Sequence, residues 1–400
     1  MDTKQTGANI TIPKGRHIMS KVKILLVGIG GYAATYVNPL LDGVRAEDCE
    51  LVGCADPYPT SCKRLEEIQA RGIPVFADMS EFFAAGLKAD LAVITTPIHL
   101  HARQIKAALA EGSSVLCEKP LCGDVADIPS LIEAREKAGK YLAIGYQWSH
   151  SDAIQALKAD IMAGVYGAPK LLKTIVLWPR DRAYYARGCG WAGKLRAGDG
   201  SLILDSVANN ATAHYLHNIF YVLGKTVDTS AMPVSLEASL WRANKIENYD
   251  TCAMDMTFED GARALYIVSH ATVKNQEPVF DYLFENGRVT FYEGDGKKLI
   301  RGVLADGTEK IYGDPFANQT AKLWRAVDAV LDPSVRPICG VEAATPHALC
   351  IAEAQKSGVR DFPADRIREN EKGTGVYVEG LYEELMNAYA TDSMWRGLAD

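Results

Sequence analysis

The feature that most constrains this chain is a series of short, continuously apolar runs between residues 21 and 146. Strands that are apolar along their whole length are buried on both faces, which is typical of a parallel sheet between two layers of helices. The segments between the runs, such as 99–111 and 128–137, carry their apolar residues on one helical face. We therefore predict a doubly wound α/β domain. The runs are 22–27, 51–55, 91–95, 114–117 and 141–144.

The second part of the chain has a different rhythm. Apolar residues recur at every second position along 234–241 and 264–268, which indicates strands of an antiparallel sheet. The length of 400 residues also favours two domains, because one core rarely serves more than about 250–300 residues. We predict a polar tail over 1–20, a Rossmann α/β domain over 21–147, and a second domain over 148–400. The second domain is expected to hold a large, mostly antiparallel open sheet with helices on one face.

Composition excludes several classes of partner. The net charge of −7 argues against nucleic acid, whose binding needs clustered Lys and Arg. No apolar stretch reaches the roughly 18 residues of a membrane helix, and the first 20 residues lack the apolar run of a secretion signal. Nine cysteines without CxxC spacing indicate reduced thiols. We expect a cytoplasmic protein with small-molecule partners.

A glycine motif follows the first apolar run. Gly28-Ile29-Gly30-Gly31-Tyr32-Ala33 has the form GxGxxA and stands where a helix begins. In a dinucleotide site the first glycine permits the tight turn, the second lets the backbone approach the pyrophosphate, and the small third residue lets helix and strand pack. The motif is weak on its own. In this position it predicts that Gly28, Gly30, Gly31, Tyr32 and Ala33 bind a dinucleotide.

An acidic residue ends the second apolar run. Asp56 stands where the adenosine ribose lies in a Rossmann domain, and a carboxylate there accepts from both ribose hydroxyls and repels a 2′-phosphate. No arginine follows until Arg64. The cofactor is therefore predicted to be NAD rather than NADP. The alternative is that Asp56 is an ordinary turn residue at the end of a strand.

Two segments, 95–101 and 118–121, stand at the ends of the runs 91–95 and 114–117 of the predicted sheet. Ligands bind beyond the carboxyl ends of parallel strands, so both segments are expected to face the cofactor. Lys119 lies in the second of them, and partial desolvation would lower the pKa of its amine and allow it to take a proton from an alcohol. The predicted cofactor contacts here are Thr96, Pro97, His101, Glu118 and Lys119.

The combination of GxGxxA, Thr96-Pro97-Ile98-His99-Leu100-His101, Glu118-Lys119-Pro120-Leu121 and Gly145-Tyr146-Gln147 resembles the glucose-fructose oxidoreductase and inositol dehydrogenase (Gfo/Idh/MocA) family. The resemblance implies an NAD-dependent dehydrogenase that transfers a hydride between nicotinamide and a secondary hydroxyl or ketone of a sugar, a sugar derivative or an inositol. It also implies that Lys119 contacts the reacting hydroxyl, that Asp56 reads the ribose and that His214, from a helix of the second domain, is catalytic.

The surroundings of His214 depart from the family pattern. Members often carry an Asp four residues before this histidine and another three after it, where this chain has Asn210 and His217. Asn210 and Asp205 are therefore rival candidates for orienting His214, and the alternative is a histidine with a packing role on a buried helix face. His214 and His217 share a helical face but lack an evident third ligand, so no metal is expected.

The loop 178–194 mixes aromatic residues, arginines and glycines, a composition suited to holding a polyol ring. An interdomain or subunit contact is the alternative for these residues. An outer sheet face carrying Leu236, Leu240, Tyr266 and Val268 would leave an apolar patch in water, so a homodimer or homotetramer is predicted. The predicted substrate contacts are Lys119, Tyr146, Trp148, Arg180, Tyr184, Trp191, Asp205, Asn210 and His214.

Two other functions fit the same motifs. A glycosidase or lyase can use bound NAD transiently, because oxidation of a ring hydroxyl acidifies the neighbouring C–H. A regulatory protein can bind NAD on this fold without turnover. The presence of Lys119 argues against the second of these.

Overall fold

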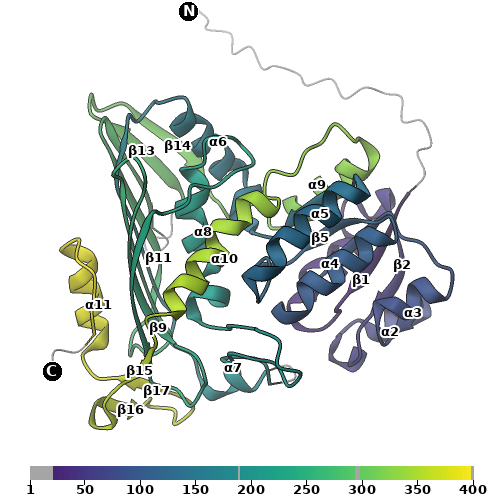
Figure 1. The fold of residues 1–400 in the computed structure, drawn as a ribbon, viewed down its shortest axis with the longest axis horizontal. Helices are drawn as coiled ribbons and strands as arrows, with labels where there is room; N and C mark the ends of the chain where they lie inside the picture. The colour runs from purple at the N-terminus through teal and green to yellow at the C-terminus, as the bar shows by residue number, and fades with distance from the viewer. Residues whose placement is uncertain (1–20, 188–189, 293–297, 398–400) are drawn as a thin grey trace, which may run out of the picture.

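The computed structural model describes residues 21–187, 190–292 and 298–397, so the tail predicted for residues 1–20 lies outside the described residues. Two sheets organise the chain and stand on either side of a layer of helices (Figure 1). In the described residues no helix has the length and apolar character needed to cross a membrane.

The first sheet is parallel and has six strands in the order β3-β2-β1-β4-β5-β6. This is the doubly wound order of a dinucleotide-binding domain, as predicted. The predicted apolar runs form five of the strands, and the two-residue β3 is the one that the sequence did not indicate. The elements are β1 (Val22–Val27), α1 (Ala34–Asp42), β2 (Cys49–Ala55), α2 (Leu65–Ala70), β3 (Val75–Phe76), α3 (Met79–Ala84), β4 (Leu91–Ile94), α4 (His101–Ala110), β5 (Ser114–Cys117), α5 (Ile128–Ala138) and β6 (Leu142–Ile144).

The second sheet has nine strands in the order β14-β13-β12-β11-β7-β10-β9-β8-β15. Its pairs are antiparallel except β7 with β10 and β8 with β15, which confirms the mostly antiparallel prediction. The elements are α6 (Asp152–Met162), β7 (Pro169–Leu177), α7 (Arg182–Ala186), a π-helix (Val207–Ala211), α8 (Ala213–Val222), β8 (Ser235–Arg242), β9 (Thr251–Thr257), β10 (Arg263–Ser269), β11 (Gln276–Phe284), β12 (Gly287–Tyr292), β13 (Ile300–Leu304), β14 (Glu309–Gly313), α9 (Ala321–Leu331), α10 (Val341–Gln355), β15 (Val359–Asp361), β16 (Ile367–Glu369), β17 (Val376–Val378) and α11 (Leu381–Ala390).

Helix α9 belongs to the first sheet although it comes late in the sequence. Leu323, Trp324 and Val327 on this helix share a buried core with Leu26 and Val93 of the parallel sheet. One helix within the range 148–400, which was predicted to form the second domain, therefore packs in the first domain. This return brings residues of α9 beneath the carboxyl ends of β4 and β5, where the predicted site lies.

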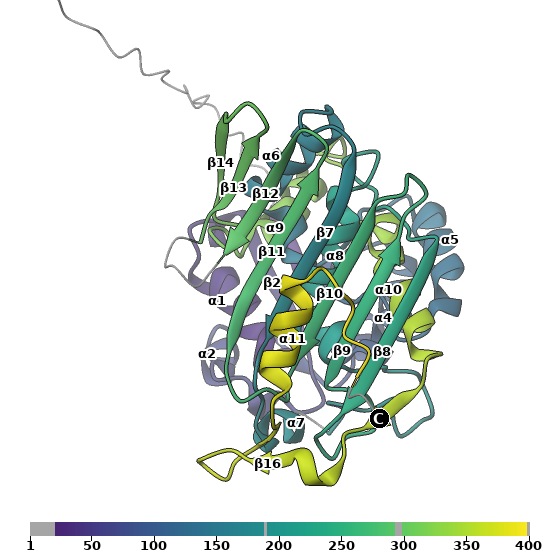
Figure 2. The ribbon, with the colours of Figure 1, turned by 90° about the vertical axis from the view of Figure 1, so that its left-hand side faces the viewer.

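The inner face of the large sheet packs on α8 and α10, and the outer face is covered by the chain's own carboxyl-terminal segment. Figure 2 shows α11 lying across this outer face. Leu381 and Leu385 of α11 and the ring of Trp395 share a buried cluster with Leu265 and Ile267 of β10. The outer face thus has an apolar cover that the sequence analysis did not foresee.

The predicted outer-face residues lie on the other side of the sheet. Leu240, Tyr266 and Val268 are buried in the core against the helices, and Leu236 packs against the same core. Their assignment to a subunit interface was wrong, because β10 is apolar on both faces and its alternation does not tell which face is inner. The homodimer or homotetramer itself stays a prediction.

The covering role of α11 is open to a stability test. Leu385→Ala removes a fully buried side chain from the cluster beneath α11 and is expected to lower the free energy of unfolding by about 2–5 kcal/mol. Asn387→Ala, at an exposed position of the same helix, is the control and should change it by no more than about 0.5 kcal/mol. Equal effects in urea unfolding would mean that α11 is not docked as described.

The hairpin of β16 and β17 also reaches the predicted substrate loop. The Arg182 N–H at the start of α7 donates to the Thr374 carbonyl at 2.8 Å, and Asp181 pairs with Gly375 as an isolated antiparallel bridge. The Arg182 guanidinium donates to the Gly373 carbonyl at 2.7 Å. The carboxyl-terminal segment therefore fixes the backbone of the loop from which α7 rises.

Candidate active site

The glycine loop after β1 is built for close approach of a ligand to the backbone. Gly28 has φ +82°, and a Cβ there would lie 2.9 Å from the Thr95 hydroxyl oxygen, which itself donates to the Gly28 carbonyl at 2.8 Å. A Cβ on Gly30 would lie 2.1 Å from the Ser61 hydroxyl oxygen. Ala33 is buried in the turn that leads into α1, whereas Tyr32 is 46% exposed at its rim. Gly31 has φ +56° and completes the turn. The tight turn at Gly28 and the buried small residue at position 33 agree with the roles expected of the motif.

Asp56 lies beside this loop at the end of β2. One carboxylate oxygen accepts from the Ile29 N–H at 2.8 Å and the other from the Tyr58 N–H at 2.8 Å. A carboxylate offers about four acceptor positions, so two remain for ribose hydroxyls. The same group therefore holds the glycine loop in shape and can read a ribose.

The segment after β4 is tied to the segment after β5 by a histidine. The ring nitrogens of His101 lie 2.8 Å from the Pro120 carbonyl oxygen and 2.9 Å from that of Thr96, and His101 is buried. Thr96 and Pro97 precede it in the turn that leads to α4, and the Thr96 hydroxyl donates to Gln104. His101 was predicted to bind the cofactor, but its contacts make it a positioning residue for Lys119.

Glu118 sits in a buried ion pair that joins the two halves of the chain. Its carboxylate accepts from the Lys322 amine of α9 and from the Tyr36 hydroxyl, and both charged side chains are almost fully buried. Burial alone would raise the pKa of Glu118, yet Lys322 and Lys119 outweigh it and hold the pKa below its ordinary value. Glu118 was also predicted as a cofactor contact, and these partners assign it a positioning role instead.

The Lys119 side chain points into a hydrogen-bonded chain from the second domain. Its amine donates to both the backbone carbonyl and the side-chain carbonyl of Asn210, each at 2.8 Å. The Asn210 amide donates to Asp205 at 2.8 Å, and the other Asp205 oxygen accepts from the Gly193 N–H at 2.6 Å. Of the two candidates that the sequence offered for orienting His214, Asn210 is therefore a direct partner of Lys119, and Asp205 is joined to Lys119 through Asn210.

Local backbone geometry produces this arrangement. Asn210 lies in the π-helix 207–211, a wider turn that lets its carbonyl and its side chain reach the same amine. Leu204, directly before Asp205, has φ +51°, a left-handed conformation that costs a non-glycine residue about 1–2 kcal/mol. π-turns and strained residues of this kind concentrate at functional sites.

The electrostatic surroundings suit proton transfer at Lys119. Burial lowers the pKa of its amine to about 8, although the carboxyl groups of Glu118 and Asp205 act in the opposite direction. The cations of Lys322 and Arg187 add to the lowering. A substantial share of the amine is therefore neutral just above neutral pH, which is the form that accepts a proton.

His214 is half-buried on α8 and lies in the same electrostatic environment. Burial lowers its pKa well below the ordinary value, and the Lys119 charge lowers it further, so the imidazole is neutral. Its Nδ1 has no hydrogen-bond partner within the part of the chain that the structure describes. His217, one turn away, is buried with its Nε2 2.9 Å from the Ser149 hydroxyl, which makes it a packed core residue.

Two predicted substrate contacts belong to the core. Tyr146 is fully buried, with its ring stacked on His217 at 3.8 Å between centroids and edge-on to His214 at 6.2 Å. Trp148 is 1% exposed and packs on the rings of Tyr215 and Phe291. Neither can line an open site in this structure. Tyr146 supports the imidazole of His214 from behind, and Trp148 fills the core.

The loop after β7 brings further side chains to the second-domain side of the site. Arg180 and Tyr184 stack on one another at 5.1 Å, and Trp191 lies 5.3 Å from the Arg187 guanidinium; all four are half-buried. Residues 188 and 189 of this loop lie outside the described residues. Arg187 was overlooked as a site residue although it lies in the loop that the sequence singled out.

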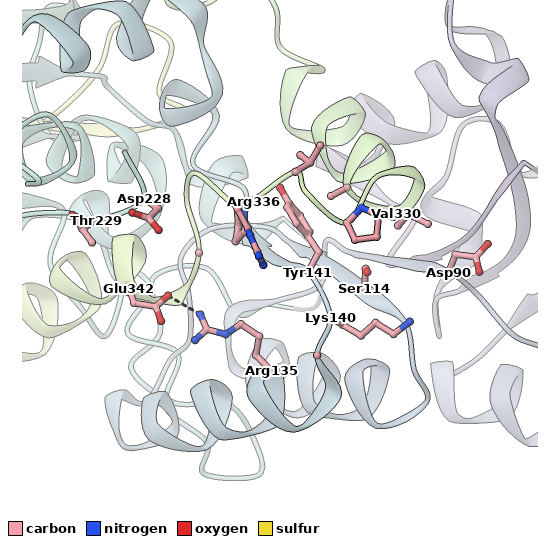
Figure 3. Close-up of a pocket in the computed structure, with 16 residues that line it drawn as sticks. Asp90, Ser114, Arg135, Lys140, Tyr141, Asp228, Thr229, Val330, Arg336 and Glu342 are labelled. Carbon is pink, nitrogen blue, oxygen red and sulfur yellow. Dashed lines mark hydrogen bonds and ion pairs between the residues drawn. The ribbon is translucent and has the colours of Figure 1, made fainter. Parts of the chain in front are cut away.

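A groove at the opposite edge of the parallel sheet does not take part. The groove has a volume of 740 Å³ and is lined by Ser114, the first residue of β5, and Tyr141, the residue before β6 (Figure 3). Cofactors bind at the carboxyl ends of such strands, so this groove lies at the wrong edge. Its lining mixes both signs of charge, as in the ion pair of Arg135 with Glu342. Across residues 21–187, 190–292 and 298–397 no three His, Cys, Asp or Glu side chains come together in a way that could hold a metal.

Comparison with known proteins points the same way as the geometry. A family model described as "Oxidoreductase family, NAD-binding Rossmann fold" matches residues 22–146. A putative UDP-kanosamine synthase oxidoreductase subunit from Amycolatopsis mediterranei is 30% identical over 229 residues, 56% of this chain and 58% of that protein. An inositol 2-dehydrogenase from Mycolicibacterium smegmatis is 30% identical over 161 residues, 39% of this chain and 45% of that protein. The chain thus spans about half the length of these relatives.

A solved structure extends the likeness to most of the fold. The WlbA dehydrogenase from Bordetella pertussis, in complex with NADH and UDP-GlcNAcA, superposes with a TM-score of 0.68 and covers 85% of this chain and 98% of that one. The sequence identity is 22%, so this match bears on the architecture alone.

Proposed function

We propose that this protein is an NAD-dependent dehydrogenase of the Gfo/Idh/MocA family, because a model of NAD-binding Rossmann oxidoreductases matches its residues 22–146 and an inositol 2-dehydrogenase is among its relatives. Its reaction moves a hydride between nicotinamide and a secondary hydroxyl or ketone of a sugar, a sugar derivative or an inositol. The observation that carries the proposal is the Lys119 amine, held at the carboxyl end of the sheet by two hydrogen bonds of 2.8 Å to Asn210. Relatives named as acting on an inositol and on a sugar nucleotide support the substrate class.

The residues present fit NAD. The glycine loop has no side chain at Gly28 and Gly30, where a Cβ would collide with Thr95 and Ser61, so its backbone can stand close to a pyrophosphate, and Asp56 offers its remaining acceptor positions to a ribose. Bound NAD would supply the hydride acceptor at its nicotinamide carbon. We assign the cofactor contacts to Gly28, Gly30, Gly31, Tyr32 and Asp56.

The chain's own groups manage the proton. In alcohol oxidation the neutral Lys119 amine takes the hydroxyl proton, and the resulting ammonium keeps its two Asn210 acceptors and faces the Asp205 carboxyl beyond them. We assign to His214, whose imidazole is neutral, a hydrogen bond to the same hydroxyl. In ketone reduction the ammonium returns the proton to the forming alkoxide.

The direct test is to supply NAD with a panel of sugars, inositols and glycosides and follow NADH fluorescence. Net NADH formation from a free sugar or inositol is the expected result. Cleavage of a glycoside without net NADH would show that the oxidation is transient and that the protein is a glycosidase or lyase. NAD binding without turnover of any compound would favour a regulatory protein.

Cofactor choice follows from Asp56. Asp56→Ala should weaken NAD binding and narrow the preference for NAD over NADP, because it removes both the ribose acceptor and the charge that repels a 2′-phosphate. Loss of even one charge-assisted hydrogen bond to the ribose corresponds to roughly 10- to 100-fold in the dissociation constant, so NAD should bind at least that much more weakly. Asp78→Ala, which removes the exposed cap of α3, is the control. A higher kcat/KM with NADP in the unaltered protein would refute the ribose assignment.

A further inference from the structure

Two arginines beside the proposed site lack the partner that a guanidinium normally has. Arg180 follows β7 and Arg187 follows α7, and no ion pair joins either of them to a carboxylate within the described ranges of the chain. Each makes one hydrogen bond to a backbone carbonyl, Arg187 to Tyr184 at 2.5 Å and Arg180 to Pro179 at 3.4 Å. A guanidinium has five N–H donors, so most remain unused.

The surroundings hold the two cations in place without neutralising them. The Arg187 guanidinium lies 3.5 Å from the centroid of the Tyr184 ring, and that of Arg180 lies 5.1 Å from the same ring. Stacking satisfies the flat face of a guanidinium and leaves the N–H groups at its edge free. The Arg180 Nε is buried and has no hydrogen-bond partner in the described residues.

The carboxylates that could pair with these arginines are engaged elsewhere. Asp205 accepts from the Gly193 N–H and the Asn210 amide, one on each oxygen, and neither arginine forms an ion pair with it in the described residues. Asp181 caps the first turn of α7, and Glu277 accepts from the Trp178 indole. Arg182, on the same short helix, shows the usual outcome at the surface, because it forms an ion pair with Glu369.

A buried histidine stands next to the two arginines. His270, 1% exposed, lies with its Nδ1 3.1 Å from the Tyr185 hydroxyl, and its ring is 5.2 Å from that of Tyr184. Its Nε2 has no partner among the residues described. When the Tyr185 hydroxyl donates to Nδ1, this Nε2 carries a hydrogen and is a further free donor.

The cluster is close enough to the reacting lysine to act on one bound molecule with it. Asp205 links Gly193, in the loop of the arginines, to Asn210 and through it to Lys119. The positive charge of Arg187 contributes to lowering the pKa of the Lys119 amine and that of the Asp205 carboxyl group. The site therefore has a proton acceptor at one end and excess positive charge with unused donors at the other.

We propose that the substrate carries an anionic group, a carboxylate or a phosphate, which Arg180 and Arg187 bind while its hydroxyl lies at Lys119. This inference rests on the proposed dehydrogenase function and narrows its substrate class to acidic sugars or cyclitols. A planar guanidinium matches the two oxygens of either group and is the side chain best suited to pair with them.

The test compares matched substrates with NAD: glucose against glucuronate for the carboxylate, and glucose against glucose 1-phosphate and glucose 6-phosphate for the phosphate. At least one anionic sugar should have the higher kcat/KM. Arg180→Gln and Arg187→Gln should each lower its kcat/KM relative to glucose by roughly 10- to 100-fold, the value of a charge-assisted contact. Arg187→Lys should retain part of the preference. A change in the pKa of Lys119 caused by the loss of Arg187 would affect both sugars equally, so it cancels in the ratio of the two kcat/KM values.

Arg336→Gln is the control, since it removes the same charge from the groove at the opposite edge of the sheet. The inference is overturned if glucose is used as well as every anionic sugar, or if the arginine variants leave the ratio unchanged; the dehydrogenase function would then still stand. If no sugar is oxidised, calorimetry of the NADH-loaded protein with glucuronate and the glucose phosphates decides. Binding that the arginine variants abolish supports the anion site, and binding that they do not change refutes it.

Discussion

Replacing Lys119 with alanine is expected to lower kcat about 10²- to 10⁴-fold, the usual cost of losing a positioned general base. The amine is the group that would remove the hydroxyl proton, and the second domain holds it through Asn210. Binding of NAD should change little, because Gly28, Gly30 and Asp56 lie at the other end of the crevice. Lys88→Ala, at an exposed ion pair with Glu111, is the control. A variant with full kcat and weakened NAD binding would show that Lys119 grips the cofactor instead.

The pH profile gives a second readout on the same residue. Because the pKa of Lys119 is about 8 and the neutral amine is the active form, kcat/KM for alcohol oxidation should rise with pH and level off above about 8. Lowering the pH through this value protonates the amine and reduces the rate. The residual activity of Lys119→Ala should lack this rise. An unchanged profile in the variant would assign the titration to another group.

Replacing Lys322 with methionine is expected to lower the free energy of unfolding by about 3–5 kcal/mol, because it leaves the buried Glu118 charge without its partner. The loss should be visible in urea unfolding. Lys310→Met, which breaks an exposed pair with Asp160, is the matched control and should cost no more than about 1 kcal/mol.

A double variant separates the ion pair from simple packing. In Glu118→Gln with Lys322→Met, neither charge of the pair is left, so the double variant should be more stable than Lys322→Met alone. If the double variant loses as much free energy of unfolding as Glu118→Gln and Lys322→Met lose together, the ion pair is not the source of the stability. The pair also predicts acid sensitivity: since the pKa of Glu118 is lowered in the folded state, its contribution is present above the ordinary carboxyl pKa and is lost as the pH falls through the lowered value.

The first domain was predictable because its signals are local. Five of its six strands are short apolar runs, which predict a doubly wound parallel sheet, whereas the order of the strands came from the structure. Strand β3 has two residues, Val75 and Phe76, and a strand of that length is too short to produce a sequence pattern. The glycine loop, Asp56 and Lys119 were found for the same reason, since each directly follows a recognisable strand.

The parts that the sequence did not reveal depend on contacts across the chain. Lys322 lies 204 residues from Glu118, and nothing in its own helix marks it as a partner of a buried carboxylate. The pairing of Asn210 with Lys119 needs a π-helix, whose spacing differs from the regular helix assumed in placing Asn210 near His214. Tyr146 and Trp148 follow a strand end as Asp56 and Lys119 do, and aromatic residues there pack inward as readily as they line a site.

The hairpin of β16 and β17 gives the site an unusual dependence on distant parts of the chain. The loop that carries Arg187 is held by backbone contacts to Thr374 and Gly375, in a segment that itself continues into the helix covering the outer face of the sheet. The proposed substrate preference therefore depends on how the carboxyl-terminal segment packs against the sheet. If Arg180 and Arg187 bind the substrate as proposed, substitutions in residues 361–400 are expected to change the preference among sugars without replacing a side chain that contacts the sugar, and transfer of the loop alone to a relative is expected not to transfer that preference.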